Sequence, residues 1–458
     1  MVSRRTLILT FCLTLTIASR IPVSLSQSTE ILVLPNSIII GISNNFLADI
    51  NITDLPDFSA FEINLAYDPS LLNVYSMSVN IPWNDTGYTI SEQEGTIYIY
   101  GFNWESSLIG NLNLATIDFY AEKMGNTTLH LYETYLYDKD MIEIPHTTSD
   151  GNVEILGMLN LQAETDKQTY YLQDCVNIYG NVSMETIPIY NSLVAIQVDT
   201  PATSPELRVF RTTTSGQVPA ELSAEILSVT PCDSEGNPKS SFNENSYAYF
   251  NVIVKNNLGT TINVLETVTL FDKASAPFAS ALLMGPVIGG GIAGWRAPIY
   301  LPSNTPAGNA TAYACLFSDF PMANGTAYCP ETSATFQIIS GKTTTLPPAP
   351  EGQASPGSFN CTFRLGLSGG VDTYNVYVTS VYKIQSNETQ VFFSASLLGD
   401  FNADGVVGPG DFYLFSKAYG STLGDPSGRY FPEADFNKDE KIGPYDFYLF
   451  GKNYGLRI

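Results

Sequence analysis

The chain has 458 residues, which is enough for three or four domains. Only 14% of the residues are charged and 12% are aromatic, a composition typical of secreted β-rich modules rather than of a cytosolic helical enzyme. The 45 acidic and 21 basic residues give a formal net charge of −24, which repels phosphate backbones and argues against nucleic-acid binding.

Residues 1–26 have the pattern of a secretory signal peptide. Arg4 and Arg5 precede the apolar stretch 7–17, and small residues around Ser26 offer a cleavage site. The apolar stretch is too short for a comfortable membrane span. We therefore expect a secreted or cell-surface protein with no membrane span after removal of the signal.

Residues 29–156 alternate between apolar and polar positions, for example at Phe61, Ile63 and Leu65, with turn signals between most of the segments. This pattern predicts a β-sandwich. The block 61–72 (FEINLAYDPSLL) and the stretches 114–119 (LATIDF) and 150–155 (DGNVEI) resemble a cohesin domain. The resemblance implies a nine-stranded jelly-roll with a flat face for a dockerin or another partner.

The middle of the chain is again predicted to be β-structure. Two Ig-like modules are expected at 157–225 and 226–340, and the second weakly resembles adhesion modules of prokaryotic surface proteins. A stiff Thr/Pro linker at 341–352 follows, and a further β segment at 353–396 leads into the C-terminal region.

Residues 397–458 contain one motif twice, at a constant offset of 35 positions. The loops 400–411 (DFNADGVVGPGD) and 435–446 (DFNKDEKIGPYD) both continue as DFYLFxKxYG. A calcium ion takes six to eight oxygen ligands, which an EF-hand-type loop supplies from positions 1, 3, 5, 7 and 12. The spacing therefore predicts two Ca²⁺ sites. Their predicted ligands are Asp400, Asn402, Asp404, the Val406 carbonyl and Asp411 in the first loop, and Asp435, Asn437, Asp439, the Lys441 carbonyl and Asp446 in the second.

Each loop is predicted to lead into one helix. Pro409 and Pro444 suit first helical positions, and Gly420 and Gly455 suit left-handed caps. The apolar residues at position 8, Val407 and Ile442, are expected to meet in a short strand pair that couples the two loops. Glu440 replaces the glycine usual at position 6, and a left-handed conformation there costs about 1–2 kcal/mol. The second site is therefore expected to be weaker.

The C-terminal region resembles a type I dockerin, the small calcium-binding module that docks onto cohesin domains. The resemblance implies the ligands named above and a partner-binding surface on the helix that follows each loop. That surface would include Tyr413, Lys417, Tyr448 and Lys452. The family often has Ser-Thr at loop positions 10 and 11, where this chain has Pro-Gly and Pro-Tyr, so the partner specificity is expected to differ.

Cysteines and sequons fit an exported protein. The five cysteines beyond the signal leave one unpaired, and Cys315 with Cys329 is the favoured disulfide, with a stabilisation of about 3 kcal/mol. Eight Asn-x-Ser/Thr sequons are candidate glycosylation sites: Asn51, Asn84, Asn126, Asn181, Asn309, Asn324, Asn360 and Asn387.

Two catalytic motifs are rejected. The GxGxxG match at 289–294 is not followed by the helix that a dinucleotide site needs. The GxSxG match at 366–370 has no histidine after it, because the only histidines are His130 and His146. No catalytic residues are predicted.

The sequence thus predicts a mainly β protein with a jelly-roll cohesin-like sandwich, Ig-like sandwich modules and a small α-helical, EF-hand-like dockerin. The predicted function is non-catalytic, calcium-dependent assembly or adhesion through cohesin- or dockerin-bearing proteins, a second copy of the chain included. A carbohydrate-binding or polysaccharide-degrading component is the alternative, because Trp83, Trp104 and Trp295 could stack on sugars. A third reading is that the calcium loops only stabilise the C-terminus.

Overall fold

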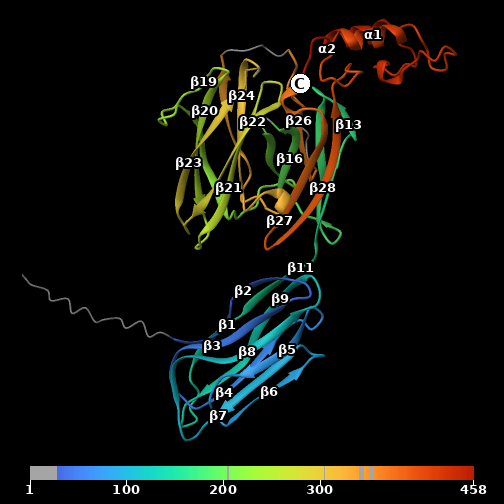
Figure 1. The fold of residues 1–458 in the computed structure, drawn as a ribbon. Helices are drawn as coiled ribbons and strands as arrows, with labels where there is room; N and C mark the ends of the chain where they lie inside the picture. The colour runs from blue at the N-terminus through green and yellow to red at the C-terminus, as the bar shows by residue number, and fades with distance from the viewer. Residues whose placement is uncertain (1–27, 204–205, 304, 340–344, 351–354) are drawn as a thin grey trace, which may run out of the picture. The chain divides into compact units, whose positions relative to one another are not determined.

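The computed structural model describes residues 28–203, 206–303, 305–339, 345–350 and 355–458. The predicted signal peptide at 1–26 and part of the predicted linker at 341–352 lie outside these residues. The chain divides into two compact units between Ile155 and Leu156. Strands dominate both units, which confirms the predicted mainly β fold (Figure 1). In the ranges described, no helix has the length and apolar character needed to cross a membrane.

The first unit is a sandwich of two sheets. The five-stranded sheet has the order β10-β1-β3-β8-β5, and the six-stranded sheet has the order β2-β11-β9-β4-β7-β6. The strands are β1 (Thr29–Leu34), β2 (Ser37–Gly41), β3 (Asn45–Phe58), β4 (Ala60–Ala66), β5 (Leu72–Val79), β6 (Asp85–Ser91), β7 (Thr96–Phe102), β8 (Leu108–Ala121), β9 (Gly125–Tyr137), β10 (His146–Ser149) and β11 (Gly151–Leu156).

Alternating side chains fill the space between these two sheets. In β4 the predicted inward residues Phe61, Ile63 and Leu65 are all buried in one core cluster. Trp83 joins this core, with its ring centroid 5.1 Å from that of Phe58. It is therefore a packing residue and does not offer a sugar-stacking surface. Trp104, in contrast, is 56% exposed.

The second unit begins with a sandwich built from both ends of residues 157–397. One sheet pairs β12, β14, β15 and β26, and the other has the order β13-β28-β27-β16-β17. These strands are β12 (Leu159–Thr165), β13 (Thr169–Tyr171), β14 (Cys175–Met184), β15 (Ile187–Pro188), β16 (Leu193–Thr203), β17 (Glu206–Thr214), β26 (Ser358–Arg364), β27 (Asp372–Tyr382) and β28 (Gln385–Ser396).

This topology differs from the predicted separation of 157–225 and 353–396. In the register of β14 and β26, Cys175 lies opposite Arg364, and β27 pairs with β16. Figure 1 shows the orange strands β27 and β28 beside the green strands β16 and β13. The two stretches therefore complete one sandwich, and the module between them is an insertion. Pairing between strands so far apart in the chain leaves no local pattern in the sequence.

The inserted module is a second sandwich. Its sheets have the orders β18-β20-β23 and β19-β25-β24-β21-β22. The strands are β18 (Ala224–Cys232), β19 (Ser241–Phe242), β20 (Ser246–Asn256), β21 (Ile262–Phe271), β22 (Pro277–Val287), β23 (Ile292–Leu301), β24 (Gly308–Phe317) and β25 (Thr332–Ile338). In the rejected GxGxxG match, Gly289 and Gly291 lie at the turn between β22 and β23, and Gly294 lies in β23. The glycines of GxSxG flank the centre of a short 3-10 helix, η2 (Leu367–Gly369).

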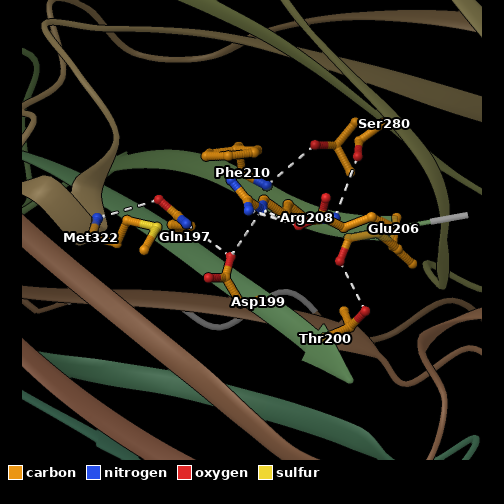
Figure 2. A network of polar contacts seen from close by, with 10 residues as sticks. Gln197, Asp199, Thr200, Glu206, Arg208, Phe210, Ser280 and Met322 are labelled. Atoms are coloured by element: carbon orange, nitrogen blue, oxygen red, sulfur yellow. Dashed lines mark hydrogen bonds and ion pairs between the residues drawn. The ribbon is translucent and has the colours of Figure 1, made fainter. Parts of the chain in front are cut away.

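Polar contacts join the inserted sandwich to its host along β17. Figure 2 shows Arg208 between Asp199 and Glu206, with its backbone N–H donating to Ser280 on β22 at 3.4 Å. Farther along β17, Arg211 forms a two-pronged ion pair with Glu331, with N···O distances of 2.8 and 2.6 Å. Both side chains are largely buried. This ion pair therefore joins the two sandwiches in addition to the chain segments that connect them.

The predicted Cys315–Cys329 disulfide is not present, because all five described cysteines are free. The two side chains belong to different clusters. Cys329 packs inside the inserted sandwich, and Cys315 packs on the side of β24 that faces β17, where its Sγ lies 3.8 Å from the Phe210 carbonyl oxygen. Burial raises the pKa of Cys329 to about 12, so this thiol stays neutral at physiological pH.

Other surface predictions can be located in the structure. The side chains of Asn84, Asn126, Asn181, Asn309 and Asn324 are exposed, whereas Asn51, Asn360 and Asn387 are half-buried. The described part of the predicted linker, residues 345–350, is hydrogen-bonded to both sandwiches of the second unit. There the Pro347 carbonyl oxygen accepts a hydrogen bond from Arg364 at 2.9 Å. This part of the linker is therefore tied to the fold.

The C-terminal tail, residues 397–458, contains two helices. They are α1 (Pro409–Ala418) and α2 (Pro444–Asn453), with a 3-10 turn, η3 (Pro432–Ala434), between them. Each helix starts at its proline, as predicted, and Gly420 and Gly455 have φ values of +82° and +87°. These values confirm the predicted left-handed caps.

Candidate metal centres of the C-terminal tail

Each predicted loop brings three carboxylates together. Asp400, Asp404 and Asp411 place carboxylate oxygens within 4.8 Å of one another. The second loop does the same with Asp435, Asp439 and Asp446. Like charges at this distance repel one another, and a bound cation would offset this repulsion.

The aspartate at position 12 is the best-fixed predicted ligand of each loop. Asp411 is fully buried, and its carboxylate accepts backbone N–H bonds from Phe401, Asn402 and Gly408 at 2.7, 3.1 and 2.8 Å. Asp446 accepts the equivalent bonds from the second loop at 2.7, 3.3 and 2.7 Å. These donors fold each loop around its last carboxylate and hold that carboxylate in one orientation.

Positions 1, 3 and 5 are held by the loop itself. Asp400 accepts the Gly405 N–H at 2.9 Å, and Asp435 accepts the Glu440 N–H at 2.8 Å. In both loops the asparagine amide donates to the position 5 aspartate, from Asn402 at 2.9 Å and from Asn437 at 2.8 Å. The asparagine side chains therefore lie beside the triads, where their Oδ1 atoms are further hard oxygen donors.

The sharp turn at position 6 needs a left-handed backbone in both loops. Gly405 has a φ of +81° and Glu440 has a φ of +66°. Glycine adopts this conformation freely, whereas a residue with a Cβ pays about 1–2 kcal/mol. The strain predicted for Glu440 is therefore present in the second loop only.

The position 8 residues do not pair with each other, which corrects the predicted strand pair between the loops. The Val407 N–H donates to the Leu456 carbonyl at 2.9 Å, beyond α2, and the Ile442 N–H donates to the Ser421 carbonyl at 3.0 Å, beyond α1. Each loop is thus closed by the segment that follows the other helix. Both Val407 and Ile442 are fully buried, so side-chain packing also stabilises this reciprocal closure of the loops.

Stacked phenylalanines form the core of the tail. The rings of Phe415 and Phe450, both buried, have centroids 5.1 Å apart, and Phe401 and Phe436 stack against them. Phe412 and Phe447 remain partly exposed, and with Phe415, Ser416 and Tyr419 they line a shallow groove of about 300 Å³.

The predicted partner surface is exposed and repeated. Tyr413 and Tyr448 are 58% and 54% exposed. The ammonium of Lys417 lies 4.1 Å from the centroid of the Tyr413 ring, and that of Lys452 lies 4.6 Å from the centroid of Tyr448. The tail therefore presents the same cation-over-aromatic pair on each helix.

One neighbour of the second loop was missed by the sequence analysis. The hydroxyl of Tyr430 donates to Asp435 at 2.7 Å, and this hydrogen bond raises the pKa of Tyr430 to about 12. The residue 35 positions earlier is Ala395, so the repeat pattern could not indicate this contact.

The donor chemistry of both loops fits calcium. All the converging groups are oxygens, and the carboxylates are already oriented by backbone N–H groups. Hard, flexible oxygen cages of this kind suit Ca²⁺, whereas the absence of sulfur and imidazole from the predicted ligand sets makes zinc a poor fit.

A second candidate surface lies on the six-stranded sheet of the first unit. Glu62 and Asn64 point outward from β4, opposite Tyr100 and Tyr98 on β7 and opposite Tyr135 and Tyr132 on β9. The tyrosines form two columns on either side of β4, and the Tyr98 and Tyr100 rings stack at 5.6 Å. We call these six residues the tyrosine face. The sequence signal for this surface is the alternation of inward and outward side chains in the segments 96–100 and 128–137.

Comparison with known proteins identifies the first unit. Residues 44–155 match the family model described as cohesin domain. This stretch of the chain is a cohesin domain. It runs from β3 through β11, and we call residues 28–155 the cohesin unit. No curated protein matched the chain.

Solved structures similar to the chain include three cohesins. A type I cohesin–dockerin complex with the OlpC cohesin of Clostridium thermocellum is 16% identical, with 28% of this chain and 93% of that chain covered and a TM-score of 0.26. A non-cellulosomal cohesin from the archaeon Archaeoglobus fulgidus is 16% identical, with 28% and 92% covered and a TM-score of 0.25. A type II cohesin from the cellulosome of Acetivibrio cellulolyticus is 13% identical, with 28% and 95% covered and a TM-score of 0.24.

Proposed function

We propose that the protein is a secreted, non-catalytic assembly protein whose C-terminal tail is a calcium-dependent dockerin. The cohesin domain implies a non-catalytic assembly role. The observation that carries the calcium part is the repeated carboxylate triad, built twice with the same backbone donors. Calcium would neutralise each triad and hold the loop that begins each helix, so binding energy becomes folding energy of the tail.

The two ends of the chain have different tasks in this proposal. The cohesin unit binds dockerin-bearing proteins through an exposed sheet, and the tyrosine face supplies the aromatic surface typical of protein interfaces. The tail binds cohesin-bearing proteins through Tyr413, Lys417, Tyr448 and Lys452. These are exposed side chains on rigid helices, which suits recognition more than stability.

Calcium titration of the full chain from residue 28 tests the calcium part. We expect calorimetry to detect two bound ions, and limited proteolysis with intact-mass analysis to show protection of residues 397–458 by Ca²⁺ but not by EDTA. The variant Asp411→Asn with Asp446→Asn should lose both effects, because it removes the best-fixed carboxylate of each loop. Asp425→Asn is the matched control, since Asp425 lies in the tail but outside both triads.

Partner capture tests the assembly role. The immobilised full chain should retain a purified cohesin module in millimolar Ca²⁺ and release it in EDTA. A chain that binds two ions but retains no cohesin or dockerin module from a panel of both types would contradict the assembly role while leaving the metal sites intact.

A further inference from the structure

The cohesin unit and the tail differ strongly in charge. Residues 28–155 carry eighteen acidic and only two basic residues, a net charge of −16. The tail carries nine acidic and six basic residues, a net charge of −3, and six of its nine acids belong to the two triads. Two Ca²⁺ ions add four positive charges and bring the tail to +1. Calcium therefore gives the tail a net charge opposite in sign to that of the cohesin unit.

The basic groups of the tail are placed where a partner would meet them. Lys417 and Lys452 are exposed on the two helices, each above a tyrosine ring. The interaction with the ring holds each ammonium close to the aromatic surface. One helix therefore offers a flat aromatic group and a positive charge at the same point.

The tyrosine face offers the complementary arrangement. Its two tyrosine columns stand on β7 and β9, which flank β4, so the strands that carry them are about 9–10 Å apart. This spacing is close to the diameter of an α-helix with its side chains. Between the two columns lie the shorter side chains of β4, and Glu62 is exposed there.

Glu62 also interacts directly with one tyrosine of the face, Tyr98. Burial raises the pKa of Tyr98, and the nearby Glu62 carboxylate, which is hydrogen-bonded to the Tyr98 hydroxyl, raises it further. The Tyr98 hydroxyl is therefore neutral at physiological pH. The face combines aromatic surface with one negative charge, whereas the tail combines aromatic surface with one positive charge on each helix.

We propose that the partner of the tail is the tyrosine face of a second copy of this chain, with Lys417 or Lys452 placed against Glu62. This inference rests on the proposed function, because it needs the calcium-bound tail. The contact joins two different surfaces, so each bound copy leaves one free face and one free tail. Such a head-to-tail contact does not close on itself and generates open chains of copies.

Sedimentation velocity of the full chain from residue 28 tests the proposal. In EDTA we expect a monomer. In millimolar Ca²⁺ at low salt we expect species whose mass grows with protein concentration, and 0.5 M NaCl should reduce them because salt screens exposed charges. Calcium binding by calorimetry is measured in the same samples.

Charge-reversal variants test the proposed contact. Glu62→Lys on the face, or Lys417→Glu with Lys452→Glu on the tail, should each weaken assembly about tenfold or more. A mixture of the two variants offers two complementary pairs, because the reversed tail of one meets the reversed face of the other, and the intact tail meets the intact face. Assembly should therefore be restored in the mixture and in a chain that carries all three substitutions. Glu30→Lys on β1 of the opposite sheet is one control for net charge. Arg429→Glu with Arg457→Glu, which lie outside both loops and both helices of the tail, is the other.

The outcomes separate this inference from the proposed function. A chain that binds two ions and remains a monomer overturns self-assembly but leaves assembly with other proteins intact. A chain that binds no ion fails both. Equal loss of assembly in the control variants would show that general charge, and not the Glu62 contact, holds the copies together, and this overturns the proposed pairing. A calcium-dependent compaction without change of mass overturns the second copy as the partner.

Discussion

Glu266 provides a direct test of the electrostatic reasoning in the inserted sandwich. Its side chain lies on β21 and is only 1% exposed, and neither carboxylate oxygen has a hydrogen-bond partner among the described residues. Neighbouring residues on the same face of the strand, Val264 and Val268, belong to the hydrophobic core. Burial alone raises the pKa of Glu266 to about 8, and no nearby charge contributes to this shift.

The sign of the pH effect follows from where the proton is bound. Below the ordinary glutamate pKa of about 4.3 the carboxyl is protonated in both the folded and the unfolded chain, and it costs nothing. Between that value and pH 8 only the unfolded chain ionises, so each pH unit lowers the free energy of unfolding by about 1.4 kcal/mol. The stability present at low pH should therefore fall by about 3–5 kcal/mol by pH 8, and then level off.

Denaturant unfolding between pH 5 and 9 measures this effect. The fluorescence of Trp295 reports on the inserted sandwich, because this residue is on β23 and packs against its core, while Trp83 and Trp104 lie in the cohesin unit. The variant Glu266→Gln keeps the shape but cannot ionise, so it should lack this fall in stability. If the stability of Glu266→Gln and of the unchanged protein declined in parallel from pH 5 to 8, the argument from burial would be wrong.

Three further substitutions test local features. Glu440→Gly should raise calcium affinity at the second loop about tenfold by calorimetry, because it removes the strain at φ +66°, whereas Glu440→Ala keeps the strain and should not. Glu331→Gln should destabilise the second unit by about 3–5 kcal/mol in denaturant unfolding, because it leaves Arg211 buried without its charge partner, while joint replacement of both by apolar residues should cost far less. Gly95→Ala should lower the thermal stability of the cohesin unit by about 2 kcal/mol or more, because its Cβ would lie 2.2 Å from a backbone oxygen, whereas Gly110→Ala, also at positive φ, meets no atom within 4 Å and should cost less.

The sequence was most informative where structure is set within a few residues. The helix starts at Pro409 and Pro444 and the left-handed caps at Gly420 and Gly455 were predicted, because each depends only on the residue type and its neighbours. The cohesin fold was predicted from alternation and from short blocks such as 61–72. Convergence of the triad carboxylates follows from the same local spacing, since one loop supplies all three.

Long-range pairing explains most of what was missed. The sequence predicted strands at both 157–225 and 353–396, but nothing in either stretch indicates that β26 pairs with β14 across an inserted sandwich. The same limit applies to Cys315 and Cys329, whose short separation favoured a disulfide. The two thiols point into different clusters, because Cys315 on β24 faces β17, whereas Cys329, which lies between β24 and β25, faces the inserted core.

The two loops are closed reciprocally, each by the segment after the other helix, and this gives the tail a property that neither repeat has alone. The segment after α2 closes the first loop at Val407, and the segment after α1 closes the second loop at Ile442. A cation that fixes one loop therefore fixes the start of the helix whose far end closes the other loop. Since Phe415 and Phe450 also share one stacked core, disorder in either loop removes contacts from both helices. If the tail binds calcium as proposed, binding at the two sites is coupled through the backbone. The net charge of the tail then changes sign in one cooperative step.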